Sequence, residues 1–294
     1  MFADTLFEES TPNRIRPIIK WAGGKSQLMP VIEAMIPKEF VSYREIFLGG
    51  AAVLLSLQPT IAFASDTNER LINLYSQIKF SCDALLLEAS SIEAEYNSLA
   101  KEQGLGASAD QEAFYYERRE EFNSGSTGIR DSALFLFLNK AGFNGLYREN
   151  RKGLFNIPFG RRAKIQLVEA ENAQNLSYFL ANVELKVSGF ESALASAECG
   201  DFVYADPPYV PLTDTASFTA YQSQGFDYED QVRLRDLLAD ASLRGVQFLL
   251  SNSDTPIVRD LYADFTIESV SAKRNVGASA RSRNVVNEVL VRNY

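Results

Sequence analysis

The chain of 294 residues has 46% hydrophobic and 23% charged residues, the balance of a globular protein with a large core. It contains no histidine, which excludes Ser-His-Asp and Cys-His catalysis and metal sites built on imidazole. A net charge of −9 argues weakly against a nucleic-acid partner, but basic residues gather at 139–166 and 273–284 and can still face DNA, because salt screens distant acidic charges.

The first part of the chain alternates between predicted helices and strands. A helix is expected to begin near Lys25, because apolar residues recur at helical spacing over 28–36. Two buried strands with following helices come next: SYREIF (42–47) with AAVLLSL (51–57), and TIAFAS (60–65) with the segment 69–79. Alternation of this kind predicts a parallel sheet.

The pattern then changes to helices alone. Three apolar helical segments are predicted: LLLEASSIEAEY (85–96), EAFYYERREEF (112–122) and SALFLFLNKA (132–141). A stretch rich in Gly, Asn and Arg follows, GFNGLYRENRKGLFNIPFGRR (142–162), with the character of a hairpin. The large apolar side chains of these helices are interpreted as a core: Phe114, Tyr115, Phe122, Leu134, Phe135, Leu136 and Phe137.

Alternation resumes in the last third of the chain. Strands are predicted at 183–187, 201–205, 246–251, 265–270 and 285–291, with a helix at 229–243. The expected organisation is an α/β domain in two pieces, 1–80 and 170–294, with a mainly helical domain inserted at 81–169.

Cysteine spacing and hydropathy exclude several other classes of protein. Cys82 and Cys199 lie far apart without metal-ligand spacing, so neither a disulfide framework nor a metal site is expected. The opening residues MFADTLFEES lack the apolar core of a signal peptide, and no apolar run approaches ~18 residues. We therefore expect a cytoplasmic protein without a membrane partner.

The stretch PIIKWAGGKS (17–26) ends like a phosphate-binding loop. Such a loop needs a glycine five positions before Gly24, where its backbone N–H groups can cradle phosphates. That position holds Ile19. A nucleotide-hydrolysing enzyme is therefore a disfavoured alternative.

Asp206-Pro207-Pro208-Tyr209 directly follows the predicted strand 201–205, at the end where open α/β sheets place their active sites. The prolines stiffen the chain and lack backbone donors, so neighbouring carbonyls and the Asp206 carboxylate become acceptors aimed at one point. Tyr209 adds a flat face. These features favour a planar amine, such as the exocyclic amino group of a nucleobase, over a simple capped turn.

A glycine turn follows the first predicted strand, in the segment Glu45–Ala51. Glycine lets a ligand approach the backbone, and the next helix offers its N-terminus. Asp66, at the end of the next strand, has the spacing of an acid that accepts hydrogen bonds from ribose hydroxyls. The turn lacks the full G-x-G-x-x-G pattern, so a nucleoside ligand without pyrophosphate is preferred.

Several long motifs together resemble one family. In chain order they are KWAGGKSQL, EIFLGG, SDTNERLINLYSQIK, FNGLYRENRKGLFNIPFGR, DFVYADPPYVPLTDTASFTAY, LLSNSDTPIVRDLY and NEVLVRNY. This is the order found in Dam-type DNA adenine-N6 methyltransferases, a group that includes enzymes methylating GATC. The resemblance implies a Rossmann-like methyltransferase sheet, mostly parallel with an antiparallel C-terminal strand, and an inserted, mainly helical target-recognition domain. It also implies methyl transfer from S-adenosylmethionine to adenine N6 in duplex DNA, within GATC, by base flipping and by a monomer that needs no metal.

The resemblance also implies roles for individual residues. Asp206, Pro207, Pro208 and Tyr209 match the catalytic tetrapeptide. Residues that match the S-adenosylmethionine site are Lys20, Trp21, Gly23, Gly24, Lys25, Phe47, Gly49, Asp66 and Asp206. Residues expected to contact DNA are Phe143, Asn144, Leu146, Arg148, Asn150, Arg151, Lys152, Pro158, Arg161, Arg162, Lys164, Lys273, Arg274, Arg281 and Arg283. Arg148 is the candidate for a bidentate guanine contact.

Two positions of the glycine turn depart from the family pattern. Ile46 stands where the family usually has proline, and Ala51 stands where it has a second glycine. Gly50 is expected to supply the missing conformational freedom. Two alternatives stay open: an amino-methyltransferase acting on cytosine N4 or on another adenine context, and a DNA-binding protein without catalysis. Cytosine-C5 methylation is excluded, because neither cysteine lies in a nucleophile motif.

Overall fold

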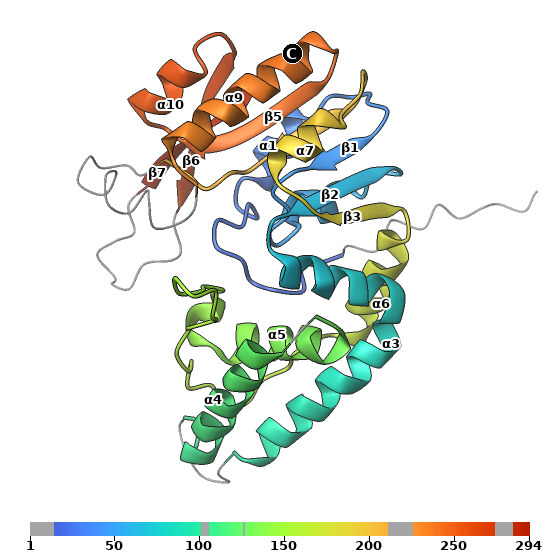
Figure 1. Cartoon of the computed structure of the whole chain (residues 1–294), viewed down its shortest axis with the longest axis vertical. Helices are drawn as coiled ribbons and strands as arrows, with labels where there is room; N and C mark the ends of the chain where they lie inside the picture. The colour runs from blue at the N-terminus through green and yellow to red at the C-terminus, as the bar shows by residue number, and fades with distance from the viewer. Residues whose placement is uncertain (1–14, 101–105, 126, 211–225, 274–284) are drawn as a thin grey trace, which may run out of the picture.

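A seven-stranded sheet and a group of long helices occupy opposite ends of the molecule (Figure 1). The structure is a computed structural model that describes residues 15–100, 106–125, 127–210, 226–273 and 285–294. The strands, each overlapping one predicted from the sequence, are β1 (Tyr43–Glu45), β2 (Ala62–Asp66), β3 (Val183–Val187), β4 (Phe202–Ala205), β5 (Gln247–Ser253), β6 (Thr266–Lys273) and β7 (Val285–Arg292).

The sheet is mostly parallel, with the strand order β3-β2-β1-β4-β5-β7-β6. Strands β1 to β5 pair in parallel, whereas β7 runs antiparallel to both β5 and β6. The predicted sheet with an antiparallel C-terminal strand is therefore confirmed. Glu45 is in register with Ala64 and Tyr204, so the carboxyl ends of β1, β2 and β4 reach the same edge.

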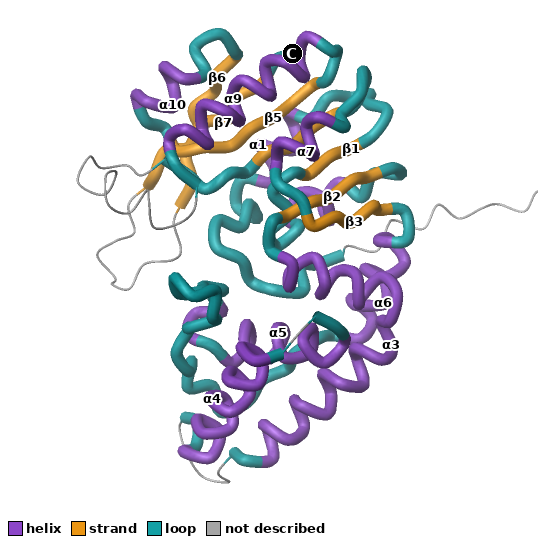
Figure 2. Tube along the Cα trace, in the orientation of Figure 1, coloured by secondary structure: helices purple, strands orange, loops and turns teal. Residues whose placement is uncertain are grey.

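Helices cover both faces of the sheet (Figure 2). One face carries α1 (Met29–Met35), α2 (Ala52–Leu57) and the first part of α3 (Glu69–Ser98); the other carries α7 (Phe190–Ala195), α9 (Tyr228–Leu243) and α10 (Pro256–Leu261). Successive residues of a strand point to opposite faces, so Tyr204 of β4 joins the first apolar cluster and Val203 joins the second.

The helical end is built on α3, which continues far beyond the helix predicted at 69–79. Its backbone is non-helical at Ser81 (φ −144°, ψ 34°), and this kink separates the two segments that the sequence presents as separate helices. The domain boundary expected between residues 80 and 81 is next to this kink and stays a prediction. The other helices here are α4 (Ala109–Ser124), α5 (Ile129–Ala141) and α6 (Ala170–Leu180). All seven side chains predicted as the core of the inserted helices are buried, as expected.

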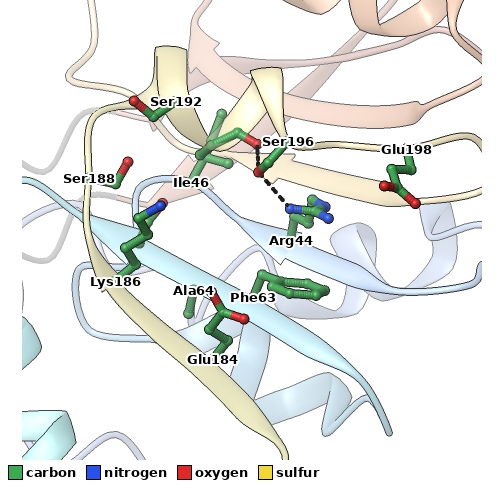
Figure 3. Close-up of a pocket in the computed structure, with 12 residues that line it drawn as sticks. Arg44, Ile46, Phe63, Ala64, Glu184, Lys186, Ser188, Ser192, Ser196 and Glu198 are labelled. Carbon is green, nitrogen blue, oxygen red and sulfur yellow. Dashed lines mark hydrogen bonds between the residues drawn. The ribbon is translucent and has the colours of Figure 1, made fainter.

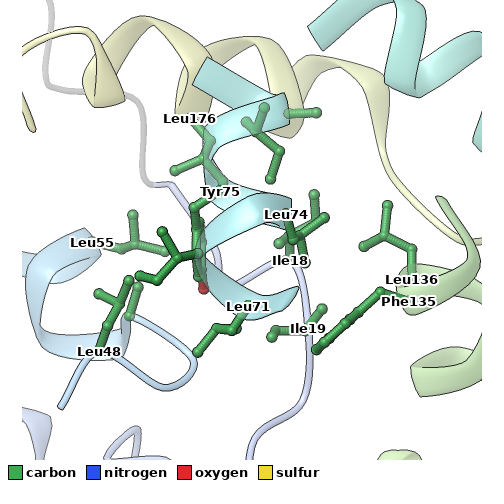
Figure 4. Packing of buried hydrophobic residues seen from close by; sticks show 14 of the residues in the cluster. Ile18, Ile19, Leu48, Leu55, Leu71, Leu74, Tyr75, Phe135, Leu136 and Leu176 are labelled. Carbon is green, nitrogen blue, oxygen red and sulfur yellow. The ribbon is translucent and has the colours of Figure 1, made fainter. Parts of the chain in front are cut away.

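The segment before the glycine pair runs through the core (Figure 4). Ile18 and Ile19 are buried among side chains of α3, such as Leu74, and of α5, such as Phe135. Ile19 stands where a phosphate-binding loop would need its first glycine, and its burial accounts for an apolar residue there. The following loop passes between the sheet and the helices (Figure 1).

Helix α1 begins at Met29, later than predicted. Lys25 and Leu28 close a turn, in which the Leu28 N–H donates to the Lys25 carbonyl at 2.9 Å. Pro30 then occupies the first turn of the helix, where a missing N–H donor costs little. Lys25 therefore precedes the helix, and its side chain turns toward the sheet edge.

Candidate active site

Several of the predicted catalytic and cofactor residues lie where strands end. Gly49 is in the turn after β1, Asp66 closes β2, and Asp206 follows β4. The neighbouring strand β5 adds Ser251 to this edge. Residues from four separate parts of the chain therefore meet at the carboxyl edge of the sheet, the position at which open α/β folds bind ligands.

Asp206 is held through both carboxylate oxygens. Its Oδ1 accepts a hydrogen bond from Ser251 Oγ at 2.7 Å, and its Oδ2 lies 2.6 Å from Lys25 Nζ. The Lys25 side chain is only 6% exposed; its ammonium also donates to the Gly23 carbonyl at 2.6 Å and lies 4.8 Å from the centre of the Tyr209 ring. One ammonium group thus joins the N-terminal loop to the tetrapeptide.

Buried polar side chains fix the backbone of the tetrapeptide. Gln231 Nε2, from α9, donates to the Pro208 carbonyl at 2.8 Å. Asn252 Oδ1 accepts from the Val210 N–H at 3.2 Å, and Ser253 Oγ donates to the Val210 carbonyl at 2.6 Å. A satisfied buried network of this kind rigidifies what it holds. All three residues were missed from the sequence; the polar ending of the apolar strand LLSNSD was the available signal for Asn252 and Ser253.

The glycine turn brings the backbone against Trp21. Gly49 has φ 47°, and a Cβ atom there would lie 2.7 Å from Trp21 Cδ1, so only glycine fits. The Gly49 N–H donates to Asp66 Oδ2 at 3.0 Å, and Asp66 Oδ1 accepts from the Asn68 N–H at 2.9 Å. Burial raises the pKa of Asp66 above 3.8, although these N–H groups favour its charged form. Trp21, the turn and Asp66 therefore form one continuous surface.

Two residues of this turn have a left-handed conformation, Gly49 with φ 47° and Ala51 with φ 56°, whereas Gly50 does not. The expectation that Gly50 supplies the conformational freedom is therefore wrong. An alanine in this conformation costs roughly 1–2 kcal/mol. The Ala51 side chain is buried in the apolar cluster on the sheet face that carries α2. Ile46, the other residue that departs from the family pattern, is buried in the cluster on the opposite face of the sheet.

Three phenylalanines lie beside the glycine turn. Phe47 stacks on Phe190 with 5.9 Å between ring centroids and meets Phe226 edge-on at 5.7 Å, while Phe190 and Phe226 are 5.6 Å apart. Of these, only Phe47 was predicted. Phe190 opens α7 just beyond the end of β3, so an aromatic residue after a predicted strand was the missed signal. Nothing local in the sequence marks Phe226.

The side chain of Lys20, another predicted cofactor residue, lies apart from the residues at the carboxyl edge of the sheet. Its side chain is exposed and passes along Gly145, where an added Cβ would lie 2.8 Å from Lys20 Cδ. Gly24, by contrast, stays in the loop, with its N–H donating to the Trp21 carbonyl at 3.3 Å.

Comparison with known proteins identifies the family. The model of the D12 class N6 adenine-specific DNA methyltransferase family matches residues 21–276. The chain belongs to this family. It is 37% identical over 286 residues to the type II methyltransferase M1.LlaDCHI of Lactococcus lactis subsp. cremoris, with 95% of this chain and 96% of that protein covered. It is 34% identical over 281 residues to the DNA adenine methylase of Escherichia coli, with 94% of each covered.

A third relative is the type II methyltransferase M.MjaIII of Methanocaldococcus jannaschii, 37% identical over 294 residues, with 95% of this chain and 99% of that protein covered. The protein is an adenine-specific DNA methyltransferase, and its substrate is DNA. The resemblance inferred from the motifs is confirmed. The alternatives of nucleotide hydrolysis and cytosine-N4 methylation find no support in these relatives.

In this methyltransferase, residues 142–162 form an irregular hairpin after α5. Isolated bridges pair Gly142 with Phe159 and Glu149 with Phe155. A short 3-10 turn, η1 (Phe143–Gly145), stands at its base. Within it, Phe143 is 49% exposed and Asn144 has φ 58°. The two residues predicted to wedge open DNA therefore lie together on an exposed, tightly turned segment.

The other residues predicted to contact DNA differ in their surroundings. Arg148 is exposed, and its Nε donates to Asn156 Oδ1 at 2.8 Å. Asn150 Oδ1 accepts from the Lys152 and Leu154 N–H groups at 2.9 and 3.2 Å, so this oxygen shapes the hairpin turn. Leu146 is half-buried, and the exposed residues are Arg151, Lys152, Pro158, Arg161, Arg162 and Lys164. Lys273 ends β6, and Arg274, Arg281 and Arg283 lie outside the described residues.

A separate pocket of about 340 Å³ lies on the face of β1, β2 and β3 beside α7 (Figure 3). Its lining includes Arg44, Phe63, Lys186 and Ser196, and none of the predicted site residues. Over the ranges that the structure describes, no three potential metal-ligating side chains gather into a site. No helix in those ranges has the length and apolarity needed to span a membrane.

Replacing Ser251 with alanine should slow methyl transfer about 10-fold, because Asp206 loses the hydrogen bond that fixes Oδ1. Single-turnover rates with saturating DNA and methyl donor measure this effect. Ser269→Ala, a hydroxyl deletion on exposed β6, is the matched control. Wild-type single-turnover rates in Ser251→Ala would show that Ser251 has no positioning role.

Proposed function

We propose that this methyltransferase takes its methyl group from S-adenosylmethionine bound at the carboxyl edge of the sheet. The chemistry of the residues there fits: Asp66 can accept bonds from ribose hydroxyls, the Phe47 ring cluster suits a purine, and no side chain intrudes at Gly49. The donor supplies a methyl group activated by a positively charged sulfur. The Asp206 carboxylate would stabilise positive charge near the reacting atoms.

The observation that carries the proposal is the fixed carboxylate of Asp206 beside a rigid diproline. Asp206 and the Pro207 carbonyl would accept the two hydrogens of adenine N6, which favours a tetrahedral nitrogen with its lone pair free to attack. A bound donor would supply the methyl group to N6 with loss of its S–C bond, and the Asp206 carboxylate would take the proton that N6 then releases. No described residue donates a hydrogen bond to the Pro207 carbonyl oxygen, so none of them competes with the base for this oxygen.

Adenine N6 is accessible only when the base leaves the duplex, at a cost of a few kcal/mol. Tyr209 offers a ring for the extruded base. The Lys25 ammonium covers one face of that ring, so the base would stack on the other. Phe143 and Asn144, on the exposed turn, would fill the gap that the extruded base leaves in the DNA stack or hold it open.

We also infer GATC as the target sequence. Arg148 would read a guanine edge through two hydrogen bonds, worth about 1–3 kcal/mol of discrimination. The exposed basic residues of the hairpin, such as Arg151 and Lys152, would hold phosphates. We further propose that the enzyme acts as a monomer in the cytoplasm.

Methyl transfer can be tested directly with S-adenosylmethionine labelled in its methyl group and a duplex carrying one GATC. We expect label in the DNA, N6-methyladenine after digestion to nucleosides, and no label when the GATC adenine is replaced. Label in duplexes without GATC would reject the target sequence and keep the activity. Active-site binding is checked by calorimetric titration: no heat with S-adenosylmethionine would favour a DNA-binding protein without catalysis.

A further inference from the structure

Three aromatic rings connect the predicted cofactor loop to the hairpin. Tyr147 stacks on Trp21 with 5.4 Å between centroids and a 22° interplanar angle, and on Phe135 at 4.9 Å and 14°. Trp21 in turn contacts the glycine turn, since a Cβ on Gly49 would clash with it. Trp21 also stacks on Phe135, at 6.4 Å and 10°, so the three rings form one cluster between α5 and the loop that leads to Lys25. Tyr147 directly precedes Arg148 in the sequence.

Asn139 forms a second connection between the same two segments. This buried residue of α5 accepts a hydrogen bond from the Lys20 N–H at 3.0 Å and donates to the Lys20 carbonyl at 2.9 Å. Its Nδ2 also donates to the Gly145 carbonyl at 3.0 Å. The backbone of Lys20 and the turn at Gly145 are thus tied to one amide, so neither can shift alone.

The two connections join elements that act on different ligands. The loop from Lys20 to Lys25 ends in the contact with Asp206, whereas the turn and Arg148 face the predicted DNA side. Asn139 is fully buried and fixes the backbone, while Trp21 and Tyr147 are only half-buried. The half-buried stack is the part of the connection that a ligand can reorganise.

We propose that Tyr147 is a positioning residue that couples binding of the methyl donor to recognition of the DNA target. A donor molecule that orders Trp21 favours the stacked position of Tyr147, and this position orients Arg148. DNA that holds Arg148 favours the same stack and so the cofactor loop. The inference rests on the proposed function, because it takes Trp21 as part of the donor site and Arg148 as part of the DNA site.

The experiment measures the Kd of S-adenosylhomocysteine, which cannot be turned over, with and without a saturating duplex that carries one GATC. The ratio of the two values is the coupling factor, which equals the effect of S-adenosylhomocysteine on DNA affinity. We expect a factor well above one in the wild type and at least a ~5-fold smaller factor in Tyr147→Ala. Tyr147→Phe, the matched control, keeps the ring and should keep the factor.

Tyr147→Leu fills similar space without a flat face and should lose the coupling as Tyr147→Ala does; thermal unfolding of each variant shows whether it is folded. A wild-type factor of one, or an unchanged factor in both the alanine and leucine variants, would overturn the inference. A wild type that does not bind S-adenosylhomocysteine at all would instead reject the proposed function. A purely structural role for Tyr147 would lower both separate affinities and leave their ratio unchanged.

Discussion

Replacing Asp206 with alanine should reduce methyl transfer at least ~10²–10³-fold, the range seen when one preorganised group at a reacting centre is removed. The carboxylate is the acceptor proposed for adenine N6, and Ser251 and Lys25 hold it in place. DNA binding should change little, because the residues predicted to contact DNA lie outside the tetrapeptide, in the hairpin and at 273–283. The defect should therefore appear in kcat and not in the affinity for DNA.

Label transfer under single-turnover conditions, together with titration of labelled duplex, separates these two quantities. Asp240→Ala removes an exposed carboxylate of α9 that pairs with Arg244, and it serves as the control. Asp206→Asn is a second test. It keeps the size of the side chain but replaces the carboxylate that pairs with the Lys25 ammonium by a neutral amide. An Asp206→Ala variant with more than a tenth of the wild-type rate would reject the assigned role.

The strands and the active edge could be predicted because their signals are local. VELKV is a strand at the residues expected, and Asp66 and Asp206 follow apolar runs whose carboxyl ends meet in any parallel sheet. Periodicity was less reliable for helix ends. The helix predicted near Lys25 starts at Met29, because a turn and then Pro30 set its beginning.

The contacts between distant segments could not be predicted, because no local pattern encodes them. Lys25 is 181 positions from Asp206 in the sequence yet forms an ion pair with it. Tyr147 follows a glycine-rich stretch that suggests only a turn, and its stacking partners come from the N-terminal loop and from α5. Ala51 adopts a conformation usually taken by glycine, so composition alone assigned to Gly50 the conformational freedom that Ala51 takes.

Glu45, at the end of β1, is a buried carboxyl group beside this site. It is 3% exposed; its Oε2 accepts hydrogen bonds from the Tyr43 hydroxyl at 2.6 Å and the Leu54 N–H at 2.8 Å. Burial raises the pKa of Glu45 from 4.5 to about 8; the two hydrogen bonds oppose this rise, nearby Asp206 adds to it and Lys25 lowers it. The folded protein therefore holds a proton that the unfolded chain releases.

The free energy of unfolding should consequently fall as the pH rises from 4.5 to about 8, because across this window the native state binds more protons than the unfolded state. Glu45→Gln keeps an acceptor oxygen and cannot ionise, so it removes this fall. We expect the variant to match the wild type near pH 4.5 and to exceed its stability at pH 8.5 by on the order of 3–5 kcal/mol.

Urea unfolding at a series of pH values measures the difference between wild type and Glu45→Gln. Other buried acids, such as Asp131 with its pKa raised by burial to about 6, titrate in both proteins and cancel in that difference. Glu184→Gln, the same replacement at an exposed position on β3, serves as the matched control. A flat difference for Glu45→Gln as well would mean that Glu45 is already ionised in the folded protein, with Lys25 and its hydrogen bonds outweighing burial.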